Sequence, residues 1–365
     1  MSINLILYAI SLFSILVYYI LNIRDVIYLI PLMSFVSLAL NPQLKFQIAT
    51  KSLANLFGLL LVFTFIGLLI NYKVLNVYSV KQSLFTMFGV FSALVLLNGV
   101  SKKNAIQLLR YFVIIMLIRE LAKNPTALIK MITNPLGFLI NSEADSESIA
   151  SFIYGGLFLS FLIIKDKTYT ALTFILMLYG GKRIVILAVI LSVVASFIYF
   201  RKNKQRPLLI PIVFVSISLL YIGGVILLVS GFFDEYVIKY FGVSVNFLLK
   251  GRVYNYTTVI DYLGGFSILG SGPGLTTYLL KSGTLDSNAG LLHSDILRIY
   301  LEYGFFMSIV IFAAIGKIAS FNKVYFSVII YLFTLLFSDN VFIYLEVVYM
   351  NFLFAILFGE YYEEN

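Results

Sequence analysis

The chain has 365 residues, of which 61% are apolar and only 12% are charged, whereas soluble domains are about half apolar and about a quarter charged. This composition excludes an ordinary soluble protein, and it predicts an all-α, polytopic integral membrane protein. The net charge of +9 does not require nucleic acid as a partner, because membrane proteins carry Lys and Arg in their cytoplasmic loops.

A membrane-spanning helix needs about 20 mostly apolar residues, and about twelve segments are candidates. In chain order they are 3–22, 26–40, 52–71, 83–100, 105–121, 148–164, 168–181, 184–200, 207–230, 294–315, 324–338 and 340–359. The first has neither the positive start nor the small-residue cleavage site of a signal peptide, so we expect it to remain as a helix. No repeat or linker divides the chain, so residues 1–365 are expected to form a single transmembrane domain.

The orientation of these spans follows from Lys and Arg in the short loops. RKNKQR at 201–206 has four positive charges in six residues and is placed in the cytoplasm. Counting outward from it puts both termini in the cytoplasm. It also puts the long segment 231–292, between the ninth and tenth spans, on the extracytoplasmic side.

The extracytoplasmic loop 231–292 is expected to be structured and to lie along the bilayer surface. Near its start Phe233, Val237 and Tyr240 share one helical face, a pattern typical of interfacial helices. Seven glycines and one proline between 264 and 290 predict tight turns rather than a long helix. GSGPG within this stretch fits neither nucleotide-loop pattern and is interpreted as a tight turn.

Several cations near the outer ends of the spans are functional candidates, because a charge within the bilayer costs about 2.5–3.5 kcal/mol. They are Arg119, Lys123, Lys182, Arg183, Arg252 and Arg298. Lys182 and Arg183 lie on the side that cations tend to avoid, and guanidinium groups bind phosphate oxygens with several donors. We interpret the group as a binding site for an extracytoplasmic anion. The alternative is that each cation snorkels to lipid headgroups.

The densest polar group is HSDILRIYLE, which begins at His293. Ser294 is placed to cap a helix, on which Asp295, Arg298 and Glu302 fall on one stripe. The stripe is either an ion-pair ladder that holds the helix in the bundle or the wall of a site, and the two are compatible. A lone histidine is often structural, but histidine is also suited to proton transfer near neutral pH. His293, Asp295 and Glu302 are therefore the candidate catalytic residues.

Two stretches carry a pattern seen elsewhere. The first, RVYNYTTVIDYLGGFSILGSGPG, starts at Arg252, and the second, HSDILRIYLEYG, ends at Gly304. Together they resemble the signature region of the bacterial O-antigen polymerase and O-antigen ligase superfamily, in which an Arg opens a segment ending in a glycine-rich turn and a His-Asn/Ser pair begins a helix closed by Glu and Gly. GGKR at 180–183 is similar to that family's entry to an earlier helix. Tyr256 stands where many members have Trp, and we expect it to pack at the membrane interface.

The resemblance implies inverting glycosyl transfer, without a metal or cofactor, from an undecaprenyl-diphosphate-linked oligosaccharide. A polymerase moves the glycan onto another lipid-linked repeat unit at the periplasmic face of the inner membrane, and a chain-length-regulating co-polymerase is an expected partner. A ligase would move the glycan to lipid A core, and a flippase would only translocate it. We favour the polymerase because no feature indicates recognition of lipid A core, and because no repeat symmetry suggests a transporter. The cations expected to bind the diphosphate are Lys182, Arg183, Arg252, Arg298 and Arg119.

Overall fold

The described part of the chain is helical throughout. A computed structural model describes residues 2–41, 48–74, 76–123, 125–126, 133, 148–201, 207–285 and 291–364, and these residues contain helices and no strands. Seven of the described helices are long and apolar enough to cross a membrane. They are α1, α3, α4, α10, α11, α16 and α18. The helical class and the membrane-protein character expected from composition are therefore confirmed.

Each of the twelve expected spans overlaps one described helix. In chain order these helices are α1 (Ile3–Leu21), α2 (Leu29–Leu40), α3 (Ile48–Ile70), α4 (Val77–Leu96), α5 (Lys102–Lys123), α8 (Ser151–Ile163), α9 (Lys167–Tyr179), α10 (Arg183–Arg201), α11 (Leu209–Val229), α16 (Asp295–Ala319), α17 (Lys323–Leu335) and α18 (Leu345–Glu364). Short 3-10 helices are η1 (Arg24–Tyr28), η2 (Tyr72–Val74) and η4 (Val341–Ile343). Because α2, α8, α9 and α17 have only 12 or 13 residues, the number of crossings stays a prediction.

The expected start of the fourth span, at residue 83, is wrong by about two turns. Asn76 and Ser79 form a capping box, each side chain bonding the other's backbone N–H, and this starts α4 at Val77. The polar residue Gln82 is therefore inside the helix. The orientation marker at 202–206 lies outside the described residues, so the direction of the spans also stays a prediction.

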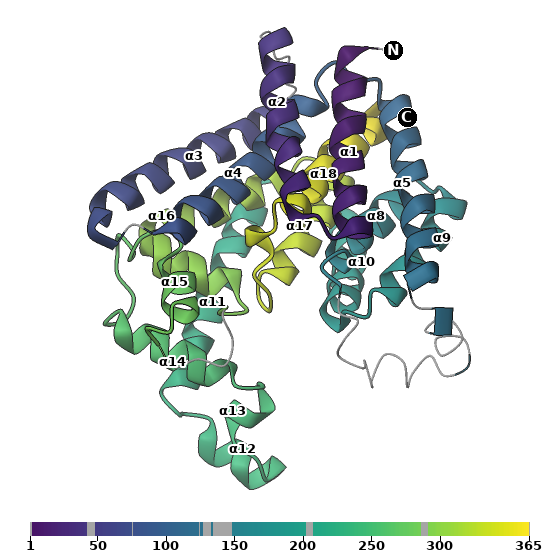
Figure 1. Cartoon of the computed structure of the whole chain (residues 1–365). Coiled ribbons are helices and arrows are strands. Elements are labelled where there is room, and N and C mark those ends of the chain that lie inside the picture. Colours follow the sequence, from purple (N-terminus) through teal and green to yellow (C-terminus); the bar gives the residue numbers. More distant parts are fainter. Residues whose placement is uncertain are drawn as a thin grey trace.

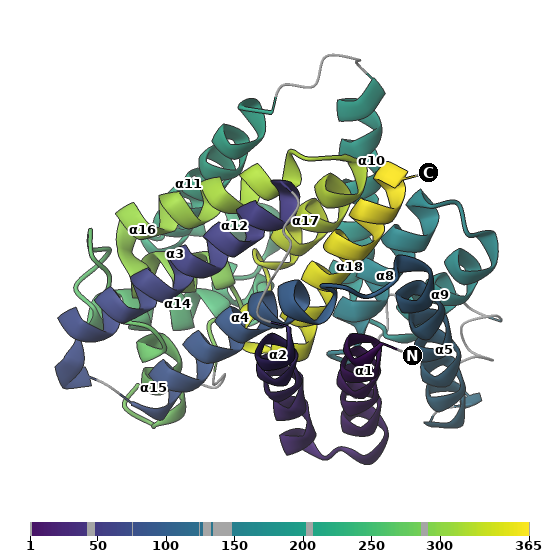
Figure 2. The ribbon, with the colours of Figure 1, turned by 90° about the horizontal axis from the view of Figure 1, so that it is seen from above.

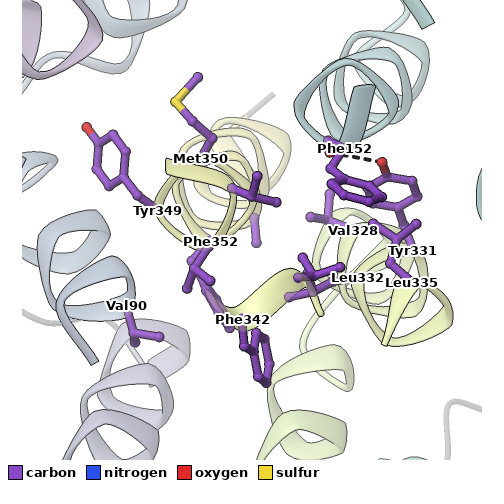
Figure 3. Close-up of a cluster of buried hydrophobic side chains, with 14 of the residues drawn as sticks. Val90, Phe152, Val328, Tyr331, Leu332, Leu335, Phe342, Tyr349, Met350 and Phe352 are labelled. Atoms are coloured by element: carbon purple, nitrogen blue, oxygen red, sulfur yellow. Dashed lines mark hydrogen bonds between the residues drawn. The ribbon is translucent and has the colours of Figure 1, made fainter. Parts of the chain in front are cut away.

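α18 lies at the centre of the packing and contacts α4, α8 and α17. Figure 3 shows the apolar cluster in which Val90 of α4, Phe152 of α8 and Tyr331 of α17 gather around α18, with Tyr331 donating a hydrogen bond to the Phe152 carbonyl at 2.9 Å. Gly89 lets α4 approach closely, since a Cβ there would be 2.6 Å from a methyl carbon of Val348. This close packing fixes α18 against α4, α8 and α17.

The segment between α11 and α16 contains four short helices in its described part. They are α12 (Asp234–Phe241), α13 (Val245–Leu248), α14 (Arg252–Tyr262) and α15 (Leu275–Lys281). α12 and α13 extend away from the bundle (Figure 1), and α12 has no buried residue. The segment is therefore structured, and α15 is as short as the glycine content predicts. Its position outside the membrane stays a prediction.

α16, which overlaps the expected span 294–315, is interrupted at one residue. Gly304 in α16 has φ 77° and ψ 175°, which breaks the helix into two pieces. Figure 2 shows α16 running beside α3 and α11, which also contact it. The cause of the break is a contact with the segment between α11 and α16, which we call the outer segment after its predicted position. This contact is part of the candidate site.

Candidate functional site

The N-terminus of α16 is held by caps from three directions. Ser294 accepts a hydrogen bond from the Leu297 N–H at 3.2 Å and so caps the helix as expected. Tyr221 of α11 donates to the Ser294 hydroxyl at 2.9 Å. Asp295 accepts from the Phe342 N–H at 2.6 Å, which ties η4 to the first turn of α16. This end of α16 is consequently fixed to both α11 and the segment before α18.

The stripe on α16 is a buried ion-pair ladder. Asp295 and Glu302 are 0% exposed and Arg298 is 4% exposed. The Arg298 guanidinium lies 2.7 Å from Asp295 and 3.3 Å from Glu302, and it also donates to the Gln82 side chain of α4 at 3.3 Å. The predicted common face is confirmed. Arg298 is occupied by partners within the protein, so the ladder joins α16 to α4.

The deep end of the ladder is bound to the outer segment. Thr276 in the first turn of α15 donates to Glu302 at 2.5 Å, and the backbone N–H of Gly274 also bonds this carboxylate. Gln82 donates to the Thr277 hydroxyl at 2.7 Å. Glu302 therefore binds both Thr276 of α15 and Arg298 of α16. This carboxylate links the outer segment to the bundle.

The GSGPG turn fits into the break in α16. The backbone N–H groups of Ser271 and Gly272 donate to the carbonyls of Leu301 at 2.9 Å and Glu302 at 3.0 Å. Gly304 has no room for a side chain, because a Cβ there would be 2.3 Å from the carbonyl oxygen of Ile268, two residues before the turn, and 2.4 Å from the backbone nitrogen of Gly270. The tight turn is as predicted, and it packs against α16 at the residue where the helix is interrupted.

His293 lies at the mouth of this arrangement, partly buried. Its φ of 55° is in the left-handed region, and its N–H donates to the Asn340 side chain at 2.7 Å. Asn340 in turn bonds Asp295 at 3.4 Å. The neighbouring Asp339 pairs with Lys182 at 3.0 Å, whose ammonium also lies 4.3 Å from the ring centroid of Phe152. Lys182 and His293 thus contact the neighbouring residues Asp339 and Asn340. We call the region formed by His293, Ser294, Asp339 and Asn340 the α16 entrance.

Arg252, the first residue of α14, approaches the α16 entrance from the outer segment. Its charge acts on Tyr221 and Tyr256, which are hydrogen-bonded to each other. Tyr256 is only 4% exposed, and burial together with Tyr221 raises the pKa of its hydroxyl, while its expected place at the membrane interface stays a prediction. Arg252 is thus connected to the Ser294 hydroxyl through Tyr221, which donates a hydrogen bond to it.

Arg183 begins α10, next to Lys182, and is exposed.

Arg119 belongs to a different group. It pairs with Glu120 and donates to the Tyr19 carbonyl at 2.7 Å, and Tyr154 donates to Glu120 at 2.8 Å. Arg119 and Lys123 line a cavity of about 830 Å³ between α1, α5 and residues 148–149. Both views place α5 and α14 on opposite sides of the molecule (Figures 1 and 2), so Arg119 and Arg252 do not share one site.

Sequence reasoning missed several polar residues of this region. Gln82, Glu120 and Glu346 are buried polar residues in apolar helices, which by itself marks them as candidates. Glu346 is 3% exposed, and Tyr19 donates to it at 3.4 Å. Asn340 could not have been placed beside His293 without the fold. Within the described ranges, no three His, Asp or Glu side chains gather as a set of metal ligands.

Comparisons with known proteins found no relationship for this chain. No protein-family model, no curated protein and no solved structure matches it.

Proposed function

We propose that the chain is a polyprenyl-diphosphate-dependent glycosyltransferase that polymerises a lipid-linked repeat unit at the outer face of a bacterial inner membrane. The observation that carries the proposal is the docking of the GSGPG turn against Glu302 and Gly304. The turn and the Glu302–Gly304 helix end are the two motifs on which the family resemblance rests. Because they contact each other, each needs the other to keep its structure. The same contact sets α15 beside Glu302.

The reaction needs a positive charge for the leaving group and an acceptor for a proton. As the anomeric carbon bonds the acceptor hydroxyl, its bond to the diphosphate breaks and the diphosphate leaves as an anion, which cations stabilise. Arg252 and Arg183 are the arginines that we assign to this role, together with Lys182, the neighbour of Arg183 in the sequence. His293 is the group that we assign to take the proton of the acceptor hydroxyl.

Arg298 and Glu302 have a positioning role in this proposal. Arg298 already has Asp295, Glu302 and Gln82 as partners and is buried, so a diphosphate would have to displace a carboxylate to reach it. Asp295 is likewise bonded to the backbone of Phe342. In this proposal the ladder joins the α16 entrance to the outer segment and takes no direct part in the reaction.

Deletion of the gene in its host bacterium tests the proposal and separates it from the two alternatives. A polymerase mutant accumulates single repeat units, on the carrier or on the cell surface, and makes no long polymer. A ligase mutant keeps long polymer on the lipid carrier. A flippase mutant retains the repeat unit on the cytoplasmic leaflet. Either of the last two results contradicts polymerisation as the function.

Complementation of the deletion then tests the assigned cation. Arg252→Ala should abolish long polymer while the protein remains inserted and abundant, and Arg252→Lys should restore little, because a point charge does not replace a bidentate fork. Lys239→Ala is the matched control, since Lys239 is an exposed cation on α12 in the same segment. Full polymer with Arg252→Ala would remove Arg252 from the site.

A further inference from the structure

Three cations outside the α16 entrance gather from three different elements. They are Arg24 in η1, Lys81 in α4 and Lys281 at the end of α15. α4 and α15 contact each other (Figure 1). Tyr28 of η1 packs on Phe85 of α4, over whose ring Lys81 lies, so η1 reaches the same face of α4. Burial lowers the pKa of Lys281, and the charges of Lys81 and Arg24 lower it further.

No carboxylate of the described residues is paired with this cluster. None of the three cations forms an ion pair with a described residue. Asp25 is the neighbour of Arg24 in the sequence and is exposed, so these four described residues together carry a net charge of +2, three cations less one carboxylate. Like charges repel at this range, and a bound anion would relieve the repulsion.

Aromatic rings hold the two ammonium groups in place. The Lys281 ammonium lies 5.3 Å from the ring centroid of Tyr78, and the Lys81 ammonium lies 5.4 Å from that of Phe85. Tyr28 of η1 packs on Phe85 with ring centroids 5.8 Å apart. Cation–π contacts of this kind favour the observed positions of the lysines over positions swung apart. The rings therefore favour positions of the two ammonium groups beside α4.

We propose that Arg24, Lys81 and Lys281 bind a phosphate group, and that this phosphate belongs to an anionic lipid headgroup. A phosphate offers several acceptor oxygens to the guanidinium and the two ammonium groups. A lipid is favoured over a soluble phosphate because exposed apolar residues surround the cations. These residues are Ile23, Tyr28, Val77, Val80 and Tyr278. The inference does not depend on the proposed glycosyltransferase activity.

The test uses the fact that the chain contains no Trp. Tyr78→Trp places a single fluorescent reporter next to Lys281 and keeps a ring beneath its ammonium. The variant is placed in phosphatidylcholine nanodiscs that contain a small fraction of either dansyl-phosphatidylglycerol or dansyl-phosphatidylcholine. We expect energy transfer to the anionic probe to exceed transfer to the zwitterionic probe. In the same background Lys81→Gln/Lys281→Gln should weaken the preference roughly fivefold per lysine, and Lys81→Arg/Lys281→Arg should keep it.

Tyr240→Trp, with and without Lys239→Gln, is the matched control, since Lys239 also lies over a tyrosine, at 5.7 Å, but on α12, which lies apart from α4 (Figure 1). It should show no comparable preference. Equal transfer to both probes from Tyr78→Trp, or an unchanged preference after both lysines become glutamine, overturns the proposal. Soluble pyrophosphate is the second arm: if it displaces the anionic probe at low concentration, the phosphate site stands and the lipid source is wrong.

Discussion

Gly270 lies so close to Glu302 that a Cβ added to the glycine would be 2.3 Å from the glutamate's carbonyl oxygen. No real side chain is accommodated at that distance. The contact joins a turn of the outer segment to the backbone of α16 at its break, so the size of one residue controls whether the two parts fit together.

Gly270→Ala should therefore lower the thermal stability of the purified protein more than an ordinary glycine substitution. The left-handed φ of 78° costs a side chain about 1–2 kcal/mol, and the overpacking adds about 1–3 kcal/mol. Gly264→Ala is the control, because Gly264 has φ 70° but a Cβ added there would meet no atom within 4 Å, so this variant should show the first effect alone. Equal melting temperatures for the two variants would mean that the turn does not dock in solution.

Glu302→Gln should lower the melting temperature together with activity, because Arg298 then keeps a weaker set of partners. Removal of one member of a buried ion pair typically costs about 3–5 kcal/mol, and retention of Asp295 and Thr276 should reduce this loss. Glu364→Gln is the control: Glu364 pairs with Lys102 but its side chain is 59% exposed, and exposed pairs contribute about 0–1 kcal/mol. A stable but inactive Glu302→Gln protein would instead assign Glu302 to the chemistry.

His293→Asn should reduce turnover while leaving protein level unchanged. Asparagine tolerates the left-handed backbone of this position, whereas alanine would add strain, so the loss can be ascribed to the imidazole. A general base contributes about 10²–10⁴ in rate.

The pH profile of the wild-type protein separates two roles of His293. A base needs neutral imidazole, so activity should rise with pH between about pH 5 and 8, whereas a cationic phosphate ligand would lose activity over that range. Wild-type turnover by purified His293→Asn would exclude both roles and leave His293 as a structural residue at the helix start.

Reporter fusions should establish the orientation of the bundle. A fusion after residue 204 should report the cytoplasm, and a fusion near residue 280 should report the outer side, because of the positive charges at 201–206. If both report the same compartment, α11 does not cross the membrane and the α16 entrance cannot face the periplasm.

Local patterns in the sequence were sufficient for the parts of the fold that depend on one helix at a time. Each expected span overlaps a helix, because long apolar runs have few alternatives to helical structure in a bilayer. The stripe of Asp295, Arg298 and Glu302 was equally predictable from the sequence, since it follows from helical spacing alone.

The partners of that stripe could not be predicted from the sequence, because they come from distant parts of the chain. Gln82 and Thr276 reach the ladder only through the packing of α4 and α15 on α16. The break at Gly304 has the same origin: glycine permits it, but the docked turn at 270–274 makes it favourable. A single sequence does not indicate which distant segments pack against each other.

The break at Gly304 also determines how the outer segment and the bundle open. The last carbonyls of the outer piece of α16 bond the amides of Ser271 and Gly272 instead of a further helical turn. The turn and that piece of helix should consequently exchange their amide protons with solvent as one cooperative unit. Glycine-rich loops usually tolerate inserted residues, but an insertion between 270 and 274 would separate α15 from Glu302. The part of the outer segment with the most loop-like composition is thus the part whose length is most tightly constrained.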